Sequence, residues 1–357
     1  MAISGTGQPE VGPNHAATRR VRARLDRDAA INRSGCGTNP SVNVLVTGGG
    51  GFIGSHLVDR LLADGHTVRV LDSFATGRRE NLAHVAGDVE IIEGDVQSYE
   101  RAATATSSCE IVFHHAALPS VPRSIQDPLM SNAVNVTGTL NLLLAARDSG
   151  VRRIVYASSS SIYGASPILP KNEDLPVAPI SPYAASKFAA ENYCRCFTEV
   201  YGLECVALRY FNLFGPRQDP NSHYAAVIPR FIEAALARRR LTIFGDGEQS
   251  RDFTYVDNVV AANMLAIDSA RAVGGVFNVA CGERVSLNEV VIRLGTLLGR
   301  KLDVERTAPR PGEVPHSLAD ITRASEALGY KVTVRFNDGL RRTLEATRAS
   351  RDLALTS

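Results

Sequence analysis

The apolar positions of the chain fall into short runs that are separated by longer segments of helical character. The runs cover residues 42–46, 67–71, 89–92, 111–114, 153–158 and 204–209. Helix-like stretches between them include residues 52–63, 132–147 and 183–201. Strands that alternate with helices predict an α/β fold with a doubly wound parallel sheet and helices on both of its faces.

Polar residues follow several of these runs, at the edge of the sheet where ligands of such folds bind. Residues 94–96 (Gly-Asp-Val) end the third run, His114 and His115 end the fourth, and residues 158–161 are four consecutive serines after the fifth. Past about residue 215 the alternation loosens into prolines, glycines and short apolar segments. This change predicts a smaller C-terminal substrate-binding lobe.

A glycine-rich turn, residues 47–54 (Thr-Gly-Gly-Gly-Gly-Phe-Ile-Gly), comes directly after the first run. A strand that stops at such a turn and opens a helix brings the backbone close to a dinucleotide pyrophosphate. Gly48 allows the tight turn, Gly51 lets the main chain approach the phosphates, and Gly54 lets the helix lie against the strand. A glycine-rich loop without this context would be a weak signal.

Asp72 ends the second run, about 20 residues after the glycines, where an acid accepts hydrogen bonds from the adenosine ribose. A carboxylate would repel a 2′-phosphate, so the sequence favours NAD over NADP. The other residues expected around the cofactor, at the start of the helix and after the third and fourth runs, are Phe52, Ile53, Asp95, Val96 and Ala116.

These features predict a Rossmann-like NAD-binding domain over residues 41–215, to which the chain returns around residues 250–280. Residues 216–345 are then mainly the substrate-binding lobe, and residues 346–357 are a tail. A chain of 357 residues with 44% hydrophobic residues is long enough for this organisation.

No run approaches the roughly 18 consecutive apolar residues of a membrane span, and the N-terminus lacks the apolar core of a secretory signal. We therefore predict a cytoplasmic protein without membrane contact.

The net charge of +2 is unevenly distributed, because residues 1–40 hold six arginines and three acids. This segment lacks apolar periodicity. A disordered extension, or a start codon placed too far upstream, explains it better than a nucleic-acid arm, so no nucleic-acid partner is expected.

The six cysteines are scattered, and Cys194 and Cys196 lack metal-ligand spacing and a nearby histidine. We expect free thiols and no metal site.

Tyr183 and Lys187 carry the candidate chemistry. They are four residues apart after Pro182, which suits a first helical turn, so both side chains share one helix face. A phenol with a pKa of about 10 is a poor base at neutral pH. A neighbouring ammonium and the positive nicotinamide ring favour the phenolate, which could remove a hydroxyl proton while hydride leaves the same carbon for NAD. Alone, this spacing also fits an ordinary helix surface.

In this order and at these separations, the glycine turn, Asp72, the serine run and the Tyr183/Lys187 pair resemble the extended short-chain dehydrogenase/reductase family. Within it, the chain is similar to the NAD-dependent UDP-sugar 4-epimerases of the UDP-glucose and UDP-N-acetylglucosamine type. The resemblance covers about residues 42–344. It implies bound NAD, a UDP-sugar substrate, and a homodimer formed through the helices at residues 132–147 and 183–201.

The serine run helps to choose among the reactions of this family. Counted back from Tyr163 and Gly164, Ser159 matches the Ser/Thr partner of the catalytic tyrosine, which would hydrogen-bond the sugar 4-hydroxyl. Relatives that eliminate water carry an Asp-Glu pair just after this residue, and the decarboxylases usually keep a glutamate there. Ser160 and Ser161 occupy these positions. The simplest remaining chemistry is oxidation at C4 and return of the hydride to the opposite face, which is 4-epimerisation.

The resemblance also implies the substrate contacts. Asn212, Arg251 and Arg310 match residues that meet the diphosphate, for which guanidinium groups are well suited. Lys187 is expected to hold the nicotinamide ribose as well. The side chains expected to border the sugar are Ser120, Arg123, Ser159, Ser160 and Ser161.

Ser317 bears on the choice of sugar. Family members restricted to glucose and galactose derivatives tend to carry a bulky tyrosine there, whereas a serine leaves room for a 2-acetamido group. The sequence predicts that UDP-GlcNAc and UDP-GalNAc are accepted, and it leaves open a preference for them over UDP-Glc and UDP-Gal. A UDP-glucuronate 4-epimerase or decarboxylase also remains open, since the arginines do not reveal a C6 carboxylate. A non-catalytic NAD-binding sensor is disfavoured by the retained catalytic residues.

Overall fold

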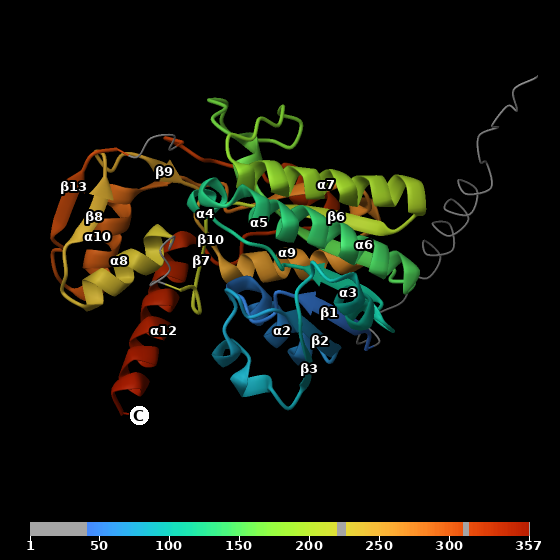
Figure 1. The fold of residues 1–357 in the computed structure, drawn as a ribbon. Coiled ribbons are helices and arrows are strands. Elements are labelled where there is room, and N and C mark those ends of the chain that lie inside the picture. The colour runs from blue at the N-terminus through green and yellow to red at the C-terminus, as the bar shows by residue number, and fades with distance from the viewer. Residues whose placement is uncertain (1–40, 220–225, 310–313, 357) are drawn as a thin grey trace, which may run out of the picture. The chain divides into compact units, whose positions relative to one another are not determined.

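The structure, a computed structural model, describes residues 41–219, 226–309 and 314–356 (Figure 1). The arginine-rich segment of residues 1–40 and the predicted diphosphate ligand Arg310 lie outside the described residues. The described chain forms one seven-stranded sheet and three sheets of two strands each.

The large sheet is parallel throughout and has the strand order β11-β6-β5-β4-β1-β2-β3. Its strands are β1 (Asn43–Thr47), β2 (Thr67–Asp72), β3 (Val89–Glu93), β4 (Ile111–His114), β5 (Arg153–Ser159), β6 (Glu204–Tyr210) and β11 (Val276–Val279). The order runs outward from β1 in both directions, so the chain switches sides between β3 and β4. Ligands of such sheets bind at this switch point, outside the carboxyl ends of the strands. The predicted doubly wound sheet is confirmed.

Helices cover both faces of the sheet (Figure 1). One layer contains α2 (Phe52–Ala63) and α9 (Val256–Asp268), and the other contains α3 (Tyr99–Thr106), α6 (Gly138–Asp148) and α7 (Pro182–Tyr201). Along β1, Val44 and Val46 pack into the first layer and Leu45 into the second. Successive side chains of a strand point to opposite faces. Burial on both faces therefore explains why these strands appear in the sequence as continuous apolar runs.

One helical stretch, Pro128–Asp148, is long and apolar enough to cross a membrane by length and composition alone. It comprises α5 (Pro128–Asn132), a π-helical turn (Ala133–Thr137) and α6. Half of it is buried inside the protein, and Leu142 and Leu143 of α6 pack into the core between this helical layer and the sheet. We therefore assign it to the helical layer of the core.

Most of the chain beyond β6 forms the smaller lobe. Its paired strands are β8 (Leu241–Phe244) with β13 (Val304–Thr307) and β9 (Ser250–Arg251) with β12 (Val285–Ser286). Its helices are α8 (Val227–Leu236), α10 (Leu287–Leu298) and α12 (Phe336–Thr356). Between these segments the chain returns to the large sheet as α9 and β11, and β11 pairs with β6.

The remaining elements are short and connect these parts. They are α4 (Val121–Gln126), β7 (Leu213–Phe214), β10 (Thr254–Tyr255), α11 (Thr322–Leu328) and the 3-10 turns Arg79–Asn81, Ala83–Val85, Ser160–Tyr163 and Ala270–Ala272. β7 and β10 pair with each other, so the chain just after β6 lies beside the start of α9.

Candidate active site

The glycine-rich turn after β1 brings three stretches of backbone together. A Cβ atom at Gly48, where φ is 71°, would lie 2.7 Å from the amide nitrogen of Ala116. A Cβ atom at Gly54 would lie 2.2 Å from the carbonyl oxygen of Gly48. No side chain fits at either position, so the turn, the start of α2 and the chain after β4 form a close-packed cradle. Phe52 and Ile53 lie in the first turn of α2, whose free N–H groups and dipole suit a pyrophosphate.

A cavity of about 430 Å³ adjoins this cradle at the carboxyl ends of β1, β2 and β3. The predicted cofactor residues in its wall are Gly48, Gly51, Asp72, Asp95, Val96 and Ala116. The cavity lies at the switch point of the sheet, where the residues present fit the adenosine and pyrophosphate of a dinucleotide.

Asp72 is held rigidly in the wall of this cavity. One carboxylate oxygen accepts a hydrogen bond from the amide of Gly50 at 2.8 Å, and the other accepts from the amide of Phe74 at 2.7 Å. Burial raises the pKa of Asp72, and these two hydrogen bonds oppose the shift. Each oxygen keeps a further lone pair, so the side chain can accept hydrogen bonds from ribose hydroxyls.

A second cavity, of about 650 Å³, gathers most of the predicted catalytic and substrate residues. Those in its wall are Ile53, Ser159, Ser160, Ser161, Tyr183, Asn212, Arg251 and Ser317. Helix α4 contributes Val121 and Ile125 to the same wall. Ser120 and Arg123 lie next to these residues rather than in the wall, and the Ser120 hydroxyl caps α4 by accepting from the amide of Arg123 at 3.2 Å.

Local hydrogen bonds fix the start of α7, which carries Tyr183 and Lys187. Ser181 caps the helix by accepting from the amide of Ala184 at 3.2 Å, and Pro182 is the first helical residue. The amide of Tyr183 donates to the hydroxyl of Ser124 on α4 at 3.0 Å. The helix therefore begins at a defined point against α4, with Tyr183 in its first turn.

The environment of Tyr183 differs from the sequence-based expectation. Burial raises the pKa of the phenol, and a side-chain hydrogen bond with Ser159 opposes the shift. Lys187 is also buried, which lowers its pKa to about 8. In the protein alone, burial therefore outweighs the effect predicted for the ammonium, and the phenol stays protonated at neutral pH. The nicotinamide charge, the other influence named above, comes with the cofactor.

Asn135 is a site residue that the sequence analysis missed. It lies in the π-helical turn between α5 and α6, and its side chain donates to the hydroxyl of Ser186 on α7 at 3.0 Å. The side-chain oxygen of Asn135 accepts a hydrogen bond from the backbone amide of Leu118, in the loop that follows β4, at 2.8 Å. Asn135 thus ties the cofactor loop to the catalytic helix. π-Helical turns occur often at functional sites, but none is visible as a sequence pattern.

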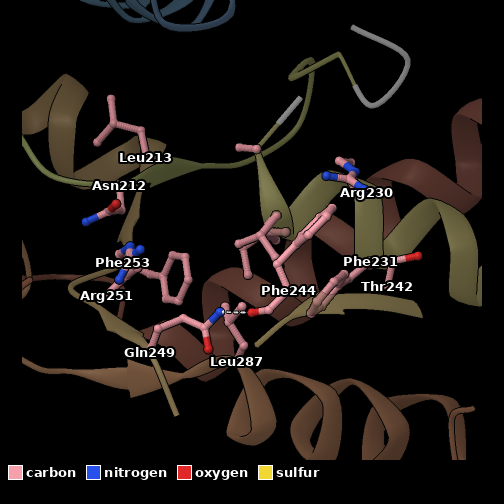
Figure 2. A pocket seen from close by; sticks show the side chains of 13 residues that line it. Asn212, Leu213, Arg230, Phe231, Thr242, Phe244, Gln249, Arg251, Phe253 and Leu287 are labelled. Carbon is pink, nitrogen blue, oxygen red and sulfur yellow. Dashed lines mark hydrogen bonds between the residues drawn. The ribbon is translucent and has the colours of Figure 1, made fainter. Parts of the chain in front are cut away.

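A third cavity, of about 260 Å³, extends into the small lobe (Figure 2). Figure 2 shows Asn212 and Arg251 on one side of it and Phe231 and Phe244 on the other. Arg251 donates to the carbonyl oxygens of Ser250 and Pro315, both at 3.0 Å. The sequence analysis found Asn212 and Arg251 but missed the aromatic wall. Asn212 and Arg251 also line the second cavity, so the two cavities share a border.

Asp252, next to Arg251, is a further residue that the sequence analysis missed. It is fully buried and accepts hydrogen bonds from the amides of Cys281, Gly282 and Ala319 at 2.9, 3.0 and 3.1 Å. Burial raises its pKa to about 6 despite these bonds. Asp252 joins the chain after β11 to the segment that follows Ser317, so it fixes the backbone on which Arg251 stands.

His114 has a structural role. Its ring nitrogens lie 2.8 Å from the hydroxyl of Thr47 and 2.9 Å from that of Thr139. Burial lowers the pKa of His114 well below its ordinary value. The neutral ring therefore bridges the end of β1 and α6.

Known proteins resemble this chain over most of its length. A model of the NAD dependent epimerase/dehydratase family matches residues 44–280. The UDP-glucose 4-epimerase of Mycolicibacterium smegmatis is 43% identical over 308 residues, which cover 85% of this chain and 98% of that protein.

Two solved structures share the fold over nearly their whole length. A UDP-N-acetylglucosamine 4-epimerase from Methanobrevibacter ruminantium, in complex with UDP-N-acetylmuramic acid, has a TM-score of 0.83 at 41% identity, over 87% of this chain and 99% of that one. A UDP-glucuronic acid 4-epimerase from Bacillus cereus, in complex with UDP-glucuronic acid and NAD, has a TM-score of 0.80 at 31% identity, over 86% and 99%. From the glycine cradle to the strand that returns to the sheet, the chain belongs to the NAD-dependent epimerase/dehydratase family.

Proposed function

We propose that this protein catalyses the NAD-dependent 4-epimerisation of a UDP-hexose through a 4-keto intermediate, with Ser159, Tyr183 and Lys187 as its catalytic residues. The observation that carries the proposal is the second cavity. It holds the hydrogen-bonded pair Ser159 and Tyr183 and borders the cavity of Asn212 and Arg251. The glycine cradle adjoins it through Ile53.

NAD, held by the glycine cradle and Asp72, would supply an acceptor for the hydride of C4 and a donor for its return. Tyr183 takes the proton of the sugar 4-hydroxyl, and Ser159 orients that hydroxyl toward the phenol. Lys187, protonated below a pH of about 8, favours the phenolate through its charge and binds the nicotinamide ribose. Ser160 and Ser161, the next side chains in the wall, are poor acids and bases. The cavity therefore favours oxidation and reduction at C4 over elimination of water.

The third cavity is the proposed site of the nucleotide. The aromatic side chains Phe231 and Phe244 suit a flat base, and Arg251 offers a planar set of donors to the diphosphate. We expect Asn212 and Arg310 to contact the same diphosphate. A firm hold on the nucleotide lets the 4-keto sugar turn and present its other face without leaving the enzyme.

We propose UDP-GlcNAc and UDP-GalNAc as substrates, with UDP-Glc and UDP-Gal as a further pair. The small side chain of Ser317 lines the second cavity, and its hydroxyl lies 3.5 Å from the side-chain nitrogen of Asn212. The related enzyme from Methanobrevibacter ruminantium acts on UDP-N-acetylglucosamine.

A UDP-glucuronate 4-epimerase or decarboxylase is the second candidate, and Lys171 favours it. Its side chain is 3% exposed, lines the same cavity and donates to the carbonyl oxygen of Ser166. Burial lowers the pKa of Lys171. An ammonium in the wall of a sugar cavity suits a carboxylate.

One experiment tests the reaction and the sugar together. The purified protein is incubated without added cofactor with UDP-GlcNAc, UDP-Glc or UDP-glucuronate, and products are separated by chromatography. Conversion of UDP-GlcNAc to UDP-GalNAc is the expected result, and it also reports retained NAD. Turnover of UDP-Glc alone contradicts the role of Ser317. Release of CO2 from UDP-glucuronate supports the second candidate, and failure with all three sugars contradicts the proposed function.

We also propose a cytoplasmic homodimer with no nucleic-acid partner. Apolar side chains remain exposed on neighbouring helices, including Leu129 and Met130 of α5 and Tyr193, Val200 and Tyr201 of α7. Burial of such a patch against a second copy would stabilise a dimer. Light scattering after size-exclusion chromatography measures the mass directly, and a monomer would contradict the proposal.

A further inference from the structure

A buried ion pair between α7 and β6 lies close to the candidate catalytic residues. Glu191 of α7 and Arg209 of β6 are 5% and 4% exposed. Arg209 donates to one carboxylate oxygen of Glu191 at 2.6 Å and to the other at 3.1 Å. The hydroxyl of Ser158, the neighbour of Ser159, donates to the same carboxylate at 2.6 Å.

The pair is fixed from several sides. Arg209 donates to the hydroxyl of Tyr163 at 2.9 Å, and that hydroxyl donates to the side-chain oxygen of Asn278 at 2.7 Å. Ser158 and Arg209 are register partners on β5 and β6. The network therefore connects α7 with three neighbouring segments of the sheet. Buried ion pairs add little to stability compared with apolar side chains of the same size, so stability alone does not account for this one.

Glu191 stands one helical turn after Lys187 and two turns after Tyr183, on the same face of α7. Its carboxylate forms hydrogen bonds with Arg209 and Ser158. At this spacing in a buried environment, its negative charge acts on the lysine through space.

The other groups that face Lys187 are neutral near pH 7. They are Tyr156 on β5, whose ring centre lies 4.8 Å from the ammonium nitrogen, Cys194 and Tyr183 on α7, and His114 and His115 at the end of β4. Burial raises the pKa of Tyr156 and Tyr183. A hydrogen bond with Cys205, together with burial, raises the pKa of Cys194 well above its ordinary value. Burial lowers the pKa of His114, and that of His115 to about 3. Among these groups, Glu191 is thus the one that carries a negative charge, and its ion-pair partner Arg209 carries a positive one.

We propose that Glu191, braced by Arg209 and Ser158, is a positioning residue that keeps Lys187 protonated during turnover. The proposal rests on the proposed function, in which Lys187 acts as an ammonium. Burial lowers the pKa of Lys187 to about 8, and Cys194 and Glu191 oppose that shift. Without Glu191, Lys187 loses its proton at a lower pH, and part of the enzyme lacks the ammonium under neutral conditions.

The test measures the protonation of Lys187 without relying on activity. The pH dependence of the Lys187 side-chain nitrogen resonance in NMR spectra of the full-length protein, assigned with the Lys187→Arg variant, gives its titration midpoint without a reagent that has to enter the buried site. The expected midpoint is about 8 in the parent chain and about one pH unit lower in Glu191→Gln. Glu191→Asp keeps the charge and should restore the parent midpoint. Glu199→Gln makes the same change at an exposed position of α7 and should leave it unmoved.

Glu191→Gln leaves Arg209 buried without its partner, so a second variant guards against a folding defect. The double variant Glu191→Leu, Arg209→Met replaces the pair by apolar side chains of similar size and should keep the thermal unfolding midpoint near that of the parent. Its Lys187 midpoint should still lie below the parent value. Unchanged Lys187 midpoints in Glu191→Gln and in the double variant overturn the inference, whatever the activity. A lowered midpoint in Glu191→Gln, together with a parent chain that epimerises no UDP-sugar, counts against the proposed function alone.

Discussion

A side-chain hydrogen bond between Ser159 of β5 and Tyr183 of α7 joins the two elements in the wall of one cavity. This relationship predicts unequal effects of their removal. Tyr183→Phe removes the proton acceptor and should lower turnover about a thousandfold, within the range for general acid-base groups. Ser159→Ala removes an orienting contact and should cost about tenfold to a hundredfold.

Both variants should retain bound NAD, because neither side chain lies in the wall of the adenosine cavity. Release of the cofactor by denaturation, followed by its absorbance, measures this directly. Unchanged turnover in Tyr183→Phe would show that another group accepts the proton.

The pKa of Lys187 predicts the upper limit of the working pH range. Burial lowers this pKa from 10.5 to about 8, so turnover should fall as the pH rises through about 8 and the ammonium is lost. This fall in turnover does not come from unfolding of the enzyme caused by deprotonation of Lys187. Between its folded and ordinary pKa, the unfolded chain binds more protons at this residue, so the contribution of Lys187 to stability increases with pH. A pH profile of kcat beside thermal unfolding midpoints separates the two effects, and a profile that stays flat well above pH 8 would contradict the assignment.

Asp72 predicts the choice of cofactor. Asp72→Ser removes a carboxylate that accepts from Gly50 and Phe74 and replaces it with a side chain that does not repel a phosphate. The variant should lose about tenfold in affinity for NAD and gain affinity for NADP. Equilibrium binding of both cofactors to stripped protein measures the change. Asp88→Ser makes the same substitution at an exposed position outside the cavity wall and is the matched control. Retained NAD preference in Asp72→Ser would contradict the role of the carboxylate.

Ser317 predicts the size of the sugar substituent that the cavity admits. Ser317→Tyr should abolish turnover of UDP-GlcNAc, because the larger ring fills space beside Asn212. Turnover of UDP-Glc should be retained within about threefold. Parallel assays of both sugars provide the control within one protein, and equal losses for both would mean that the variant disturbs the lobe as a whole.

Asp252 predicts a stability effect away from the reacting atoms. Asp252→Ala leaves three buried amides without an acceptor and should lower the free energy of unfolding by about 3 kcal/mol. Asp252→Asn keeps one oxygen acceptor and should lose less. Urea denaturation of both variants gives the difference. If Asp252→Ala is as stable as the parent, solvent or a rearranged loop satisfies these amides.

The strand ends show which parts of the site can be predicted from sequence. Gly48, Asp72 and the serine run were predicted because the hydrophobic pattern marks the end of each strand, and ligands of a parallel sheet bind at those ends. The choice of Ser159 within that run came from the family resemblance. Tyr183 was found because a capped helix places residues four apart on one face. In each case, a local pattern coincides with a general rule of the fold.

The residues that were missed depend on contacts between distant segments. Phe231 and Phe244 come from α8 and β8, and nothing in either segment tells a cavity wall from an ordinary core position. Asn135 owes its place to a π-helical turn, and Asp252 to three amides that are 29, 30 and 67 residues away along the chain. The direction of the Tyr183 pKa also required the structure, because burial decides it and burial cannot be read from spacing.

The pairing of β11 with β6 has a consequence for how the chain reaches its folded state. A nascent chain that has emerged only as far as β7 contains six of the seven strands but leaves β6 as an open edge, with unpaired backbone groups. Such an edge invites pairing with other chains. Completion of the sheet waits for synthesis of about 65 further residues, and during this delay the open edge is exposed to aggregation. Truncations that end near residue 215 should therefore be insoluble, whereas the full chain closes its own edge.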